Sequence, residues 1–138
     1  MNLFIDTSTL VKRYVEEQHS DEVDELFLKA DFIEVSSITR IKLNSALARR
    51  LADKSIDKKS YEMALTQFNN EFDFFTVIGF TNGVEAESVN LIKKHQMKTL
   101  DGVQLASARL SRRDSFVTSD KRLYDIAVKE LPVECIYI

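Results

Sequence analysis

Short apolar runs alternate with amphipathic segments from one end of this chain to the other. Strands are predicted where the runs are short and bounded by polar residues, at 3–5, 32–35, 74–78, 115–118 and 134–138. Between them, apolar residues recur at three- and four-residue spacing, which indicates helices. Including their caps, we expect these helices at about 8–15, 20–29, 39–53, 57–72, 81–96, 99–110 and 120–130. Thr39, Asp57, Thr81-Asn82 and Ser119-Asp120 are the expected caps of four of them. This alternation favours a parallel sheet with right-handed crossovers and helices on both faces.

The first apolar run, Leu3-Phe4-Ile5, is followed directly by the carboxylate of Asp6. A continuous apolar run predicts a strand buried on both faces, as in the middle of a parallel sheet. Asp6 then stands at the carboxyl end of that strand, the edge where open α/β sheets bind their ligands. Taken alone, Asp6 is better explained as the N-cap of the following helix. A functional role therefore depends on other carboxylates reaching the same edge.

The bulk composition narrows the classes of protein to consider. A length of 138 residues suits one domain, and 44% hydrophobic with 30% charged residues is an ordinary balance. The net charge of −3 argues against tight, sequence-independent DNA binding but leaves room for a local basic rim. Cys135 is the only cysteine, so the chain can form no internal disulfide, and the reducing cytoplasm is the simplest location for the protein. We expect Cys135 itself in the last strand. No signal peptide is visible and no apolar run approaches the roughly 20 residues that span a bilayer, so we expect no membrane association.

Two further aspartates are expected at the same edge of the sheet as Asp6. Asp120 follows the strand at 115–118, and Asp101 begins a helix just after Lys98-Thr99-Leu100. Parallel strands share one direction, so the three carboxylates converge, and crowded like charges are costly unless a cation shares them. Mg²⁺ or Mn²⁺ suits such a site, because these hard ions take a few carboxylates and keep several waters. The ion would activate a water for attack on a phosphodiester. Each aspartate alone can also be a simple N-cap.

Other polar residues near this edge of the sheet could take part in the site or could be purely structural. The hydroxyl groups beside the aspartates could orient metal-bound waters or the carboxylates, or could only cap helices: Thr7, Ser8, Thr118 and Ser119. Three arginines could contact phosphates or an acidic partner, or could be solvated: Arg13, Arg40 and Arg49. No Cys/His cluster offers a zinc site, and both His19 and His95 are expected on the surface.

Four blocks of the sequence resemble a PIN domain: Ile5–Lys12, Ser36–Ile41, Leu100–Ala108 and Phe116–Leu123. The closest likeness is to the VapC toxins of bacterial and archaeal toxin–antitoxin pairs, and it covers nearly the whole chain. The resemblance implies one PIN-like domain over residues 1–138, a three-layer α/β sandwich with a mostly parallel sheet of about five strands and about seven helices. It also implies metal-dependent endoribonuclease activity, with Asp6, Asp101 and Asp120 as catalytic metal ligands. The implied partners are RNA, a small cognate antitoxin whose tail enters the active site, and a second copy of the chain.

One position departs from the family's pattern. The second block of PIN domains normally carries a glutamate as a metal ligand two residues after the arginine, and here that residue is Lys42. At a mid-range effective dielectric, an ammonium about 4 Å from a metal repels it by roughly 4 kcal/mol per unit of metal charge. Lys42 could instead pair with one of the three aspartates and take the cation's place. We therefore expect a metal-poor and catalytically weak form of the ribonuclease.

Two other classes stay open. With Lys42 in the site, the chain could bind RNA or an antitoxin peptide without cutting RNA. It could also be an α/β receiver or phosphatase, in which Asp6 and Lys42 would form the phosphoryl-accepting pair. Ser8 stands where the common Asp-x-Asp-x-Thr phosphatases carry their second acid, which disfavours that kind of phosphatase.

Overall fold

Seven helices and five strands alternate along the chain in this computed structural model, which describes all 138 residues. Both numbers agree with the expectation from the sequence. The strands are β1 (Asn2–Ile5), β2 (Phe32–Ser36), β3 (Thr76–Ile78), β4 (Ser115–Thr118) and β5 (Glu134–Tyr137). The helices are α1 (Thr7–Tyr14), α2 (Ser20–Lys29), α3 (Thr39–Ala52), α4 (Lys58–Phe72), α5 (Asn82–His95), α6 (Thr99–Leu110) and α7 (Lys121–Glu130).

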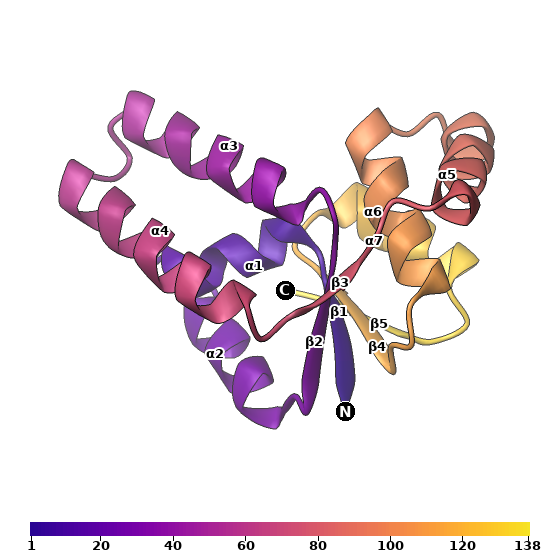
Figure 1. Cartoon of the computed structure of the whole chain (residues 1–138), viewed down its shortest axis with the longest axis horizontal. Coiled ribbons are helices and arrows are strands. Elements are labelled where there is room, and N and C mark those ends of the chain that lie inside the picture. The colour runs from indigo at the N-terminus through magenta and orange to yellow at the C-terminus, as the bar shows by residue number, and fades with distance from the viewer.

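One sheet contains all five strands, in the order β3-β2-β1-β4-β5, and every pairing in it is parallel. Figure 1 shows the sheet between two groups of helices, with α1 to α4 on one side and α5 to α7 on the other. The predicted three-layer α/β sandwich is therefore confirmed. β1 takes the centre of the sheet because its apolar run, Leu3-Phe4-Ile5, is fully buried and can pack on both faces.

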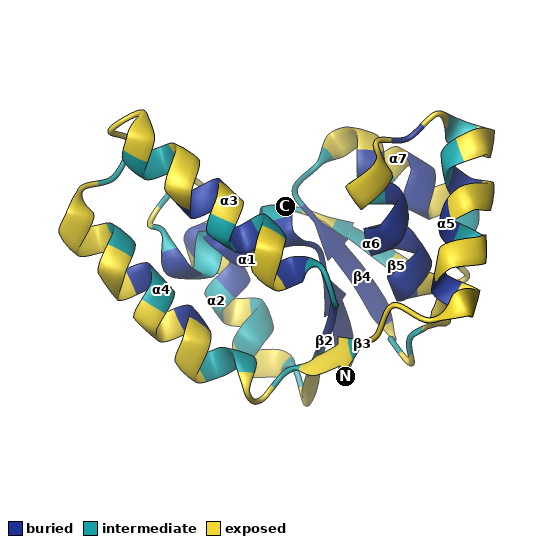
Figure 2. Ribbon diagram, turned by 45° about the horizontal axis from the view of Figure 1, so that its top comes forward, coloured by how far each residue is buried: buried dark blue, intermediate teal, exposed yellow.

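Each face of the sheet has its own core, because successive strand residues point to opposite faces. Leu3 and Ile5 of β1 pack with Leu10 of α1 and with other residues of the α1–α4 layer. Phe4 points to the opposite layer, where its ring centroid lies 6.0 Å from that of Phe116 in β4. Figure 2 shows that burial is concentrated in the sheet and in α6, whereas α4 and α5 expose their outer faces.

Helix α6 is buried along most of its length, from Gly102 to Ala108. It approaches α5 closely at Gly102, where an added Cβ would stand 2.5 Å from Cγ1 of Ile92. Only glycine permits this approach without displacing the isoleucine side chain. The tight packing fixes the first turn of α6, and that turn carries Asp101.

Most element ends differ from the predictions by at most one residue, and two differences have a clear physical cause. β3 begins at Thr76 rather than at Phe74, because a turn continues from α4 and the N–H of Phe74 donates to the carbonyl of Glu71 at 2.9 Å. Thr39 is the first residue of α3 instead of its N-cap; Ile38 is the cap, and the Thr39 hydroxyl is buried without a partner. Four predicted caps are confirmed by side-chain bonds to first-turn N–H groups: Asp6, Asp57, Thr81 and Asp120.

Candidate functional site

A cavity of about 320 Å³ opens at the carboxyl ends of the central strands β1 and β4. All three aspartates singled out from the sequence line it, and so does Lys42. The complete lining is Asp6, Thr7, Ser8, Val11, Lys12, Glu17, Lys42, Ala46, Arg49, Arg50, Asp101, Ser119 and Asp120. A larger cavity, of about 1000 Å³, lies along α4 and holds none of the predicted site residues. A search for the site by cavity size alone would therefore have selected the wrong cavity for these carboxylates.

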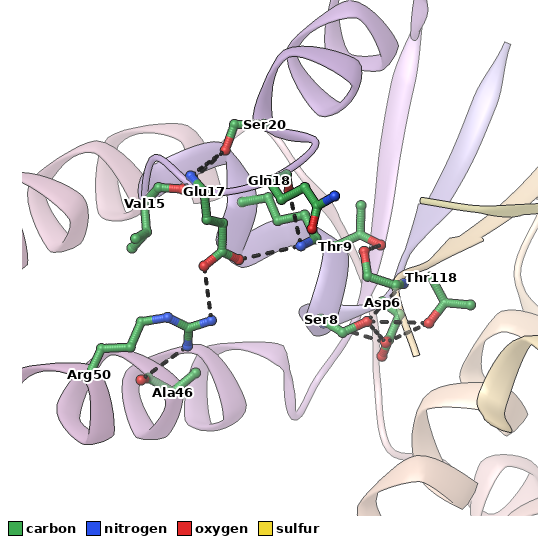
Figure 3. Close-up of polar contacts among 12 residues, drawn as sticks. Asp6, Ser8, Thr9, Val15, Glu17, Gln18, Ser20, Ala46, Arg50 and Thr118 are labelled. Carbon is green, nitrogen blue, oxygen red and sulfur yellow. Dashed lines mark hydrogen bonds and ion pairs between the residues drawn. The ribbon is translucent and has the colours of Figure 1, made fainter. Parts of the chain in front are cut away.

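Asp6 is the most deeply buried of the three aspartates, at 1% exposure. Its Oδ2 accepts hydrogen bonds from the Ser8 hydroxyl at 2.5 Å and the Thr118 hydroxyl at 3.0 Å, and it caps α1 through the Ser8 N–H at 3.4 Å. Figure 3 shows these hydroxyl groups converging on the carboxylate. Its Oδ1 is buried with no hydrogen-bond partner. Asp6 is thus both an N-cap and a carboxylate with one oxygen free for another ligand.

Burial raises the pKa of Asp6 above its usual value. The ammonium of Lys42 and the hydroxyl groups of Ser8 and Thr118 act in the opposite direction, whereas the nearby carboxylate of Asp101 adds to the rise. A carboxylate whose ionised form is disfavoured in this way is stabilised by any cation that reaches it.

Lys42 pairs with Asp101 across the cavity. The Nζ atom of Lys42, on α3, lies 3.1 Å from Oδ1 of Asp101, in the first turn of α6. Both side chains are only about a quarter exposed. The sequence had left open which aspartate would take this ammonium, and the structure selects Asp101. Asp101 does not cap its helix, because Lys98 is the N-cap of α6.

Asp120 keeps the structural role that its position in the sequence suggested. Its Oδ1 accepts the N–H of Leu123 at 3.0 Å and so caps α7. Its own N–H donates to the Thr118 hydroxyl at 3.1 Å. The same carboxylate lines the cavity, so capping and a place in the site are compatible for Asp120.

The neighbouring hydroxyl groups link β1 and α1 to the segment after β4. Ser8 Oγ accepts the N–H of Ser119 at 3.0 Å, and Ser119 Oγ lies 2.9 Å from the hydroxyl of Thr9. Thr7 accepts a hydrogen bond from Nε2 of Gln104, a fully buried residue of α6, at 2.7 Å. These contacts hold Asp6 in place. Nothing in the sequence had singled out Gln104.

The predicted arginines divide between the cavity and the outer structure. Arg49 lines the cavity. Arg13 instead pairs with Asp24 and Glu71, at 2.7 and 2.8 Å. Arg40 donates to Asn69 at 2.8 Å and lies over the ring of Phe72. Neither Arg13 nor Arg40 is part of the cavity lining.

The two histidines do not share one environment. The expectation that both are surface residues is confirmed for His19, which is exposed, whereas His95 is only partly exposed at the end of α5. The side chain of His95 is 14% exposed, and its Nε2 lies 2.6 Å from Oε1 of Glu130. The single cysteine, Cys135, lies in β5 as expected.

Three charged residues of the cavity were not predicted: Lys12, Glu17 and Arg50. Glu17 lies in the loop between α1 and α2, where no periodic pattern marks it. With them, four acidic and four basic side chains line one cavity. The site is therefore charge-balanced rather than purely acidic.

The carboxylates are of the right kind for Mg²⁺ or Mn²⁺, and the free Oδ1 of Asp6 is the type of atom such an ion takes. Their arrangement is less suitable. Asp101 is held by Lys42, and no group of three or more Asp, Glu, His or Cys side chains is placed to hold a metal ion. The assignment of Asp6, Asp101 and Asp120 as metal ligands stays a prediction. No helix combines the length and apolar character needed to cross a membrane.

Comparison with known proteins identifies the family to which the chain belongs. The PIN domain family model matches residues 3–129, a range that contains all four sequence blocks and every residue of the cavity lining. No curated protein matches the chain.

Several solved structures share the fold. FitAcB from Neisseria gonorrhoeae is 16% identical, with a TM-score of 0.72 over 99% of this chain and 96% of that one. VapC20 of Mycobacterium tuberculosis, described as a toxin that cleaves the sarcin-ricin loop, is 14% identical, with a TM-score of 0.71 over 94% and 95%. A toxin–antitoxin complex from Klebsiella pneumoniae is 18% identical, with a TM-score of 0.67 over 88% and 89%. Together with the family match, these similarities show that the chain belongs to the PIN domain family.

Proposed function

We propose that residues 1–138 form one PIN domain of the toxin–antitoxin type, which binds RNA where Asp6, Asp101 and Asp120 meet. PIN domain proteins are generally nucleases that use a divalent metal, which supports metal-dependent cleavage of RNA phosphodiesters as the chemistry of this cavity. A divalent ion held by Asp6, Asp101 and Asp120 would supply an activated water and neutralise charge on the phosphodiester. In this chain we expect that activity to be weak.

One observation carries the proposal of weak activity: the 3.1 Å ion pair between Lys42 Nζ and Asp101 Oδ1. An ammonium in this position repels a metal ion and engages one of the carboxylates that would bind it. It also brings a positive charge to a cavity that has Asp6 and Asp120 on its walls. The ammonium therefore lowers the repulsion between these aspartates and RNA phosphates even where metal binding is poor.

The test is to replace the ammonium by the carboxylate that the family pattern has at this position. We expect Lys42→Glu to cleave RNA at least about tenfold faster than the parent chain at millimolar Mg²⁺ or Mn²⁺, which corresponds to about 1.4 kcal/mol of the barrier. Lys93→Glu is the matched control, because it reverses an exposed charge on α5 outside the cavity. A parent chain that already cleaves as fast as Lys42→Glu contradicts the proposal.

The alternative is a module that binds RNA or an antitoxin without cutting RNA, and the same ion pair favours it. Calorimetric titration distinguishes the two functions. A chain that takes up no Mg²⁺ or Mn²⁺ at millimolar concentration, yet binds RNA, supports the non-cleaving module. A receiver or phosphatase gains no support, because Lys42 pairs with Asp101 rather than with Asp6.

The partners are proposals of the same kind. Similar folds occur in toxin–antitoxin complexes, which supports a cognate antitoxin as a partner of this chain. We further propose a homodimer in the cytoplasm. Light scattering on the purified chain tests whether it is a homodimer.

A further inference from the structure

The cavity has a basic end as well as an acidic one. Helix α3 contributes Lys42, Ala46, Arg49 and Arg50 to the lining, a spacing that keeps them on one face of the helix. Because a helix rises 1.5 Å per residue, Arg49 lies about 10 Å along α3 from Lys42. Helix α1 contributes Lys12 to the same lining, in addition to the two arginines. The aspartates therefore occupy one end of the cavity. Lys12, Arg49 and Arg50, which have no role in the proposed chemistry, line the cavity beyond that end.

Glu17 lies between two of these cations. Its Oε1 is 3.5 Å from Lys12 Nζ, and its Oε2 is 3.3 Å from Nη2 of Arg50. One carboxylate thus bridges α1 and α3, with a different cation on each oxygen (Figure 3). The side chains of Lys12, Glu17 and Arg50 are 15%, 27% and 27% exposed, so the group is partly sheltered from water.

The loop that carries Glu17 is held at its base. The N–H of Glu17 donates to Ser20 Oγ at 3.0 Å, and that hydroxyl donates to the carbonyl of Val15 at 3.2 Å. Ser20 itself is buried. Because these bonds involve the backbone of Glu17, its side chain can leave the two cations without unfolding the loop.

We propose that Lys12, Arg49 and Arg50 form an anion subsite for a backbone phosphate of RNA, and that Glu17 fills this subsite in the free protein as an internal counter-ion. The subsite rests on the proposed function, since one RNA strand would extend from the aspartates to the end of α3. A phosphate suits the subsite because a guanidinium binds two phosphate oxygens at once. Partly exposed ion pairs are weak, so an incoming phosphate can displace the carboxylate.

A role for Glu17 as a metal ligand fits the geometry less well than a role as a counter-ion. Both of its oxygens are engaged by cations, and no cluster of three acidic side chains exists that it could complete as a metal ligand. The carboxylate therefore competes with a phosphate rather than assisting a metal.

The experiment measures binding of a fluorescein-labelled single-stranded RNA 12-mer by anisotropy, on the full chain and in EDTA so that cleavage does not intervene. We expect Glu17→Gln to bind about three- to tenfold more tightly than the parent chain, because it removes the carboxylate charge that competes with phosphate for Lys12 and Arg50. These two cations keep their bonds to the carbonyls of Gln18 and Ala46. Glu16→Gln is the matched control. It removes the same charge one residue away, from an exposed side chain outside the cavity.

Two further variants show whether the effect passes through the subsite. Arg50→Gln should weaken binding and lower the slope of log K against log salt by about 0.7, the value for one lost contact to a single strand. In that background the gain from Glu17→Gln should shrink, as expected for residues that share one interaction. Thermal unfolding with inorganic pyrophosphate provides a readout that needs no RNA: it should stabilise Glu17→Gln more than Glu16→Gln.

The outcomes separate the subsite from the proposed function. If the parent chain binds RNA but Glu17→Gln and Glu16→Gln bind it equally well, the subsite is refuted and the proposed function survives. If pyrophosphate stabilises Glu17→Gln selectively but no form binds RNA, the anion subsite stands and the RNA function is refuted. If Glu17→Gln only lowers Tm, with no gain for either ligand, Glu17 is a structural link between α1 and α3 and the proposal fails.

Discussion

Replacing Asp6 by Asn should make the metal-free protein more stable at neutral pH while removing a carboxylate from the site. The Asp6 side chain is buried, and its Oδ1 has no hydrogen-bond partner. A buried group left without a partner costs about 1–3 kcal/mol, and more when it is charged. The amide nitrogen of Asn would also lack a partner there, so the gain from the substitution is the removal of the buried charge. Attraction to Lys42 offsets part of this cost. Asn is as good an N-cap as Asp, so the start of α1 is not weakened.

We therefore expect a net gain of about 1 kcal/mol at pH 7, close to 3–4 °C in Tm for a chain of 138 residues. The gain should depend on pH. Burial raises the pKa of Asp6, so the folded protein favours the neutral form of this side chain. The stability that comes from the neutral form is complete below the unfolded-state pKa of about 3.9 and is lost as the pH rises through the raised folded-state pKa. Asp6→Asn avoids that loss, so its advantage should be small near pH 4 and should grow toward neutral pH.

The assay is thermal unfolding of the parent chain and Asp6→Asn in EDTA, at several values from pH 4 to pH 8. Asp73→Asn is the control, because it makes the same change at an exposed carboxylate next to α4. The reasoning is refuted if Asp6→Asn is less stable than the parent at every pH, or if the difference between them does not change with pH.

Two further predictions concern the rest of the fold. Phe68→Ala should cost about 3–5 kcal/mol in urea unfolding, because Phe68 is fully buried with its ring 5.2 Å from that of Phe72; a loss below about 1 kcal/mol would contradict this. Lys94 and His95 hold the pKa of Glu130 at about 2. The resulting stability is present above the unfolded-state pKa of about 4.3 and is lost as the pH falls toward 2. Glu130→Gln should therefore flatten the acid limb of a plot of Tm against pH, and parallel curves for variant and parent would refute the assignment.

Much of the fold could be predicted from the sequence because it depends on patterns within about ten residues. The buried run Leu3-Phe4-Ile5, the alternation of strands and helices, and caps such as Asp57 and Thr81 are all local features, and the structure has them. Errors occur where a local pattern competes with a contact made elsewhere. Phe74, for example, has the character of a strand residue but is held in the turn that ends α4.

The meeting of three aspartates in one cavity also followed from the sequence, since parallel strands bring their carboxyl ends to one edge. The sequence by itself thus determined the order of the elements and the acidic end of the site. Only the tertiary structure decided which cation faces which acid. Lys42 meets Asp101, a residue 59 positions away, and Arg50 meets Glu17, 33 positions away. Such pairings depend on distances between helices in the folded chain, and no local pattern of residues encodes those distances.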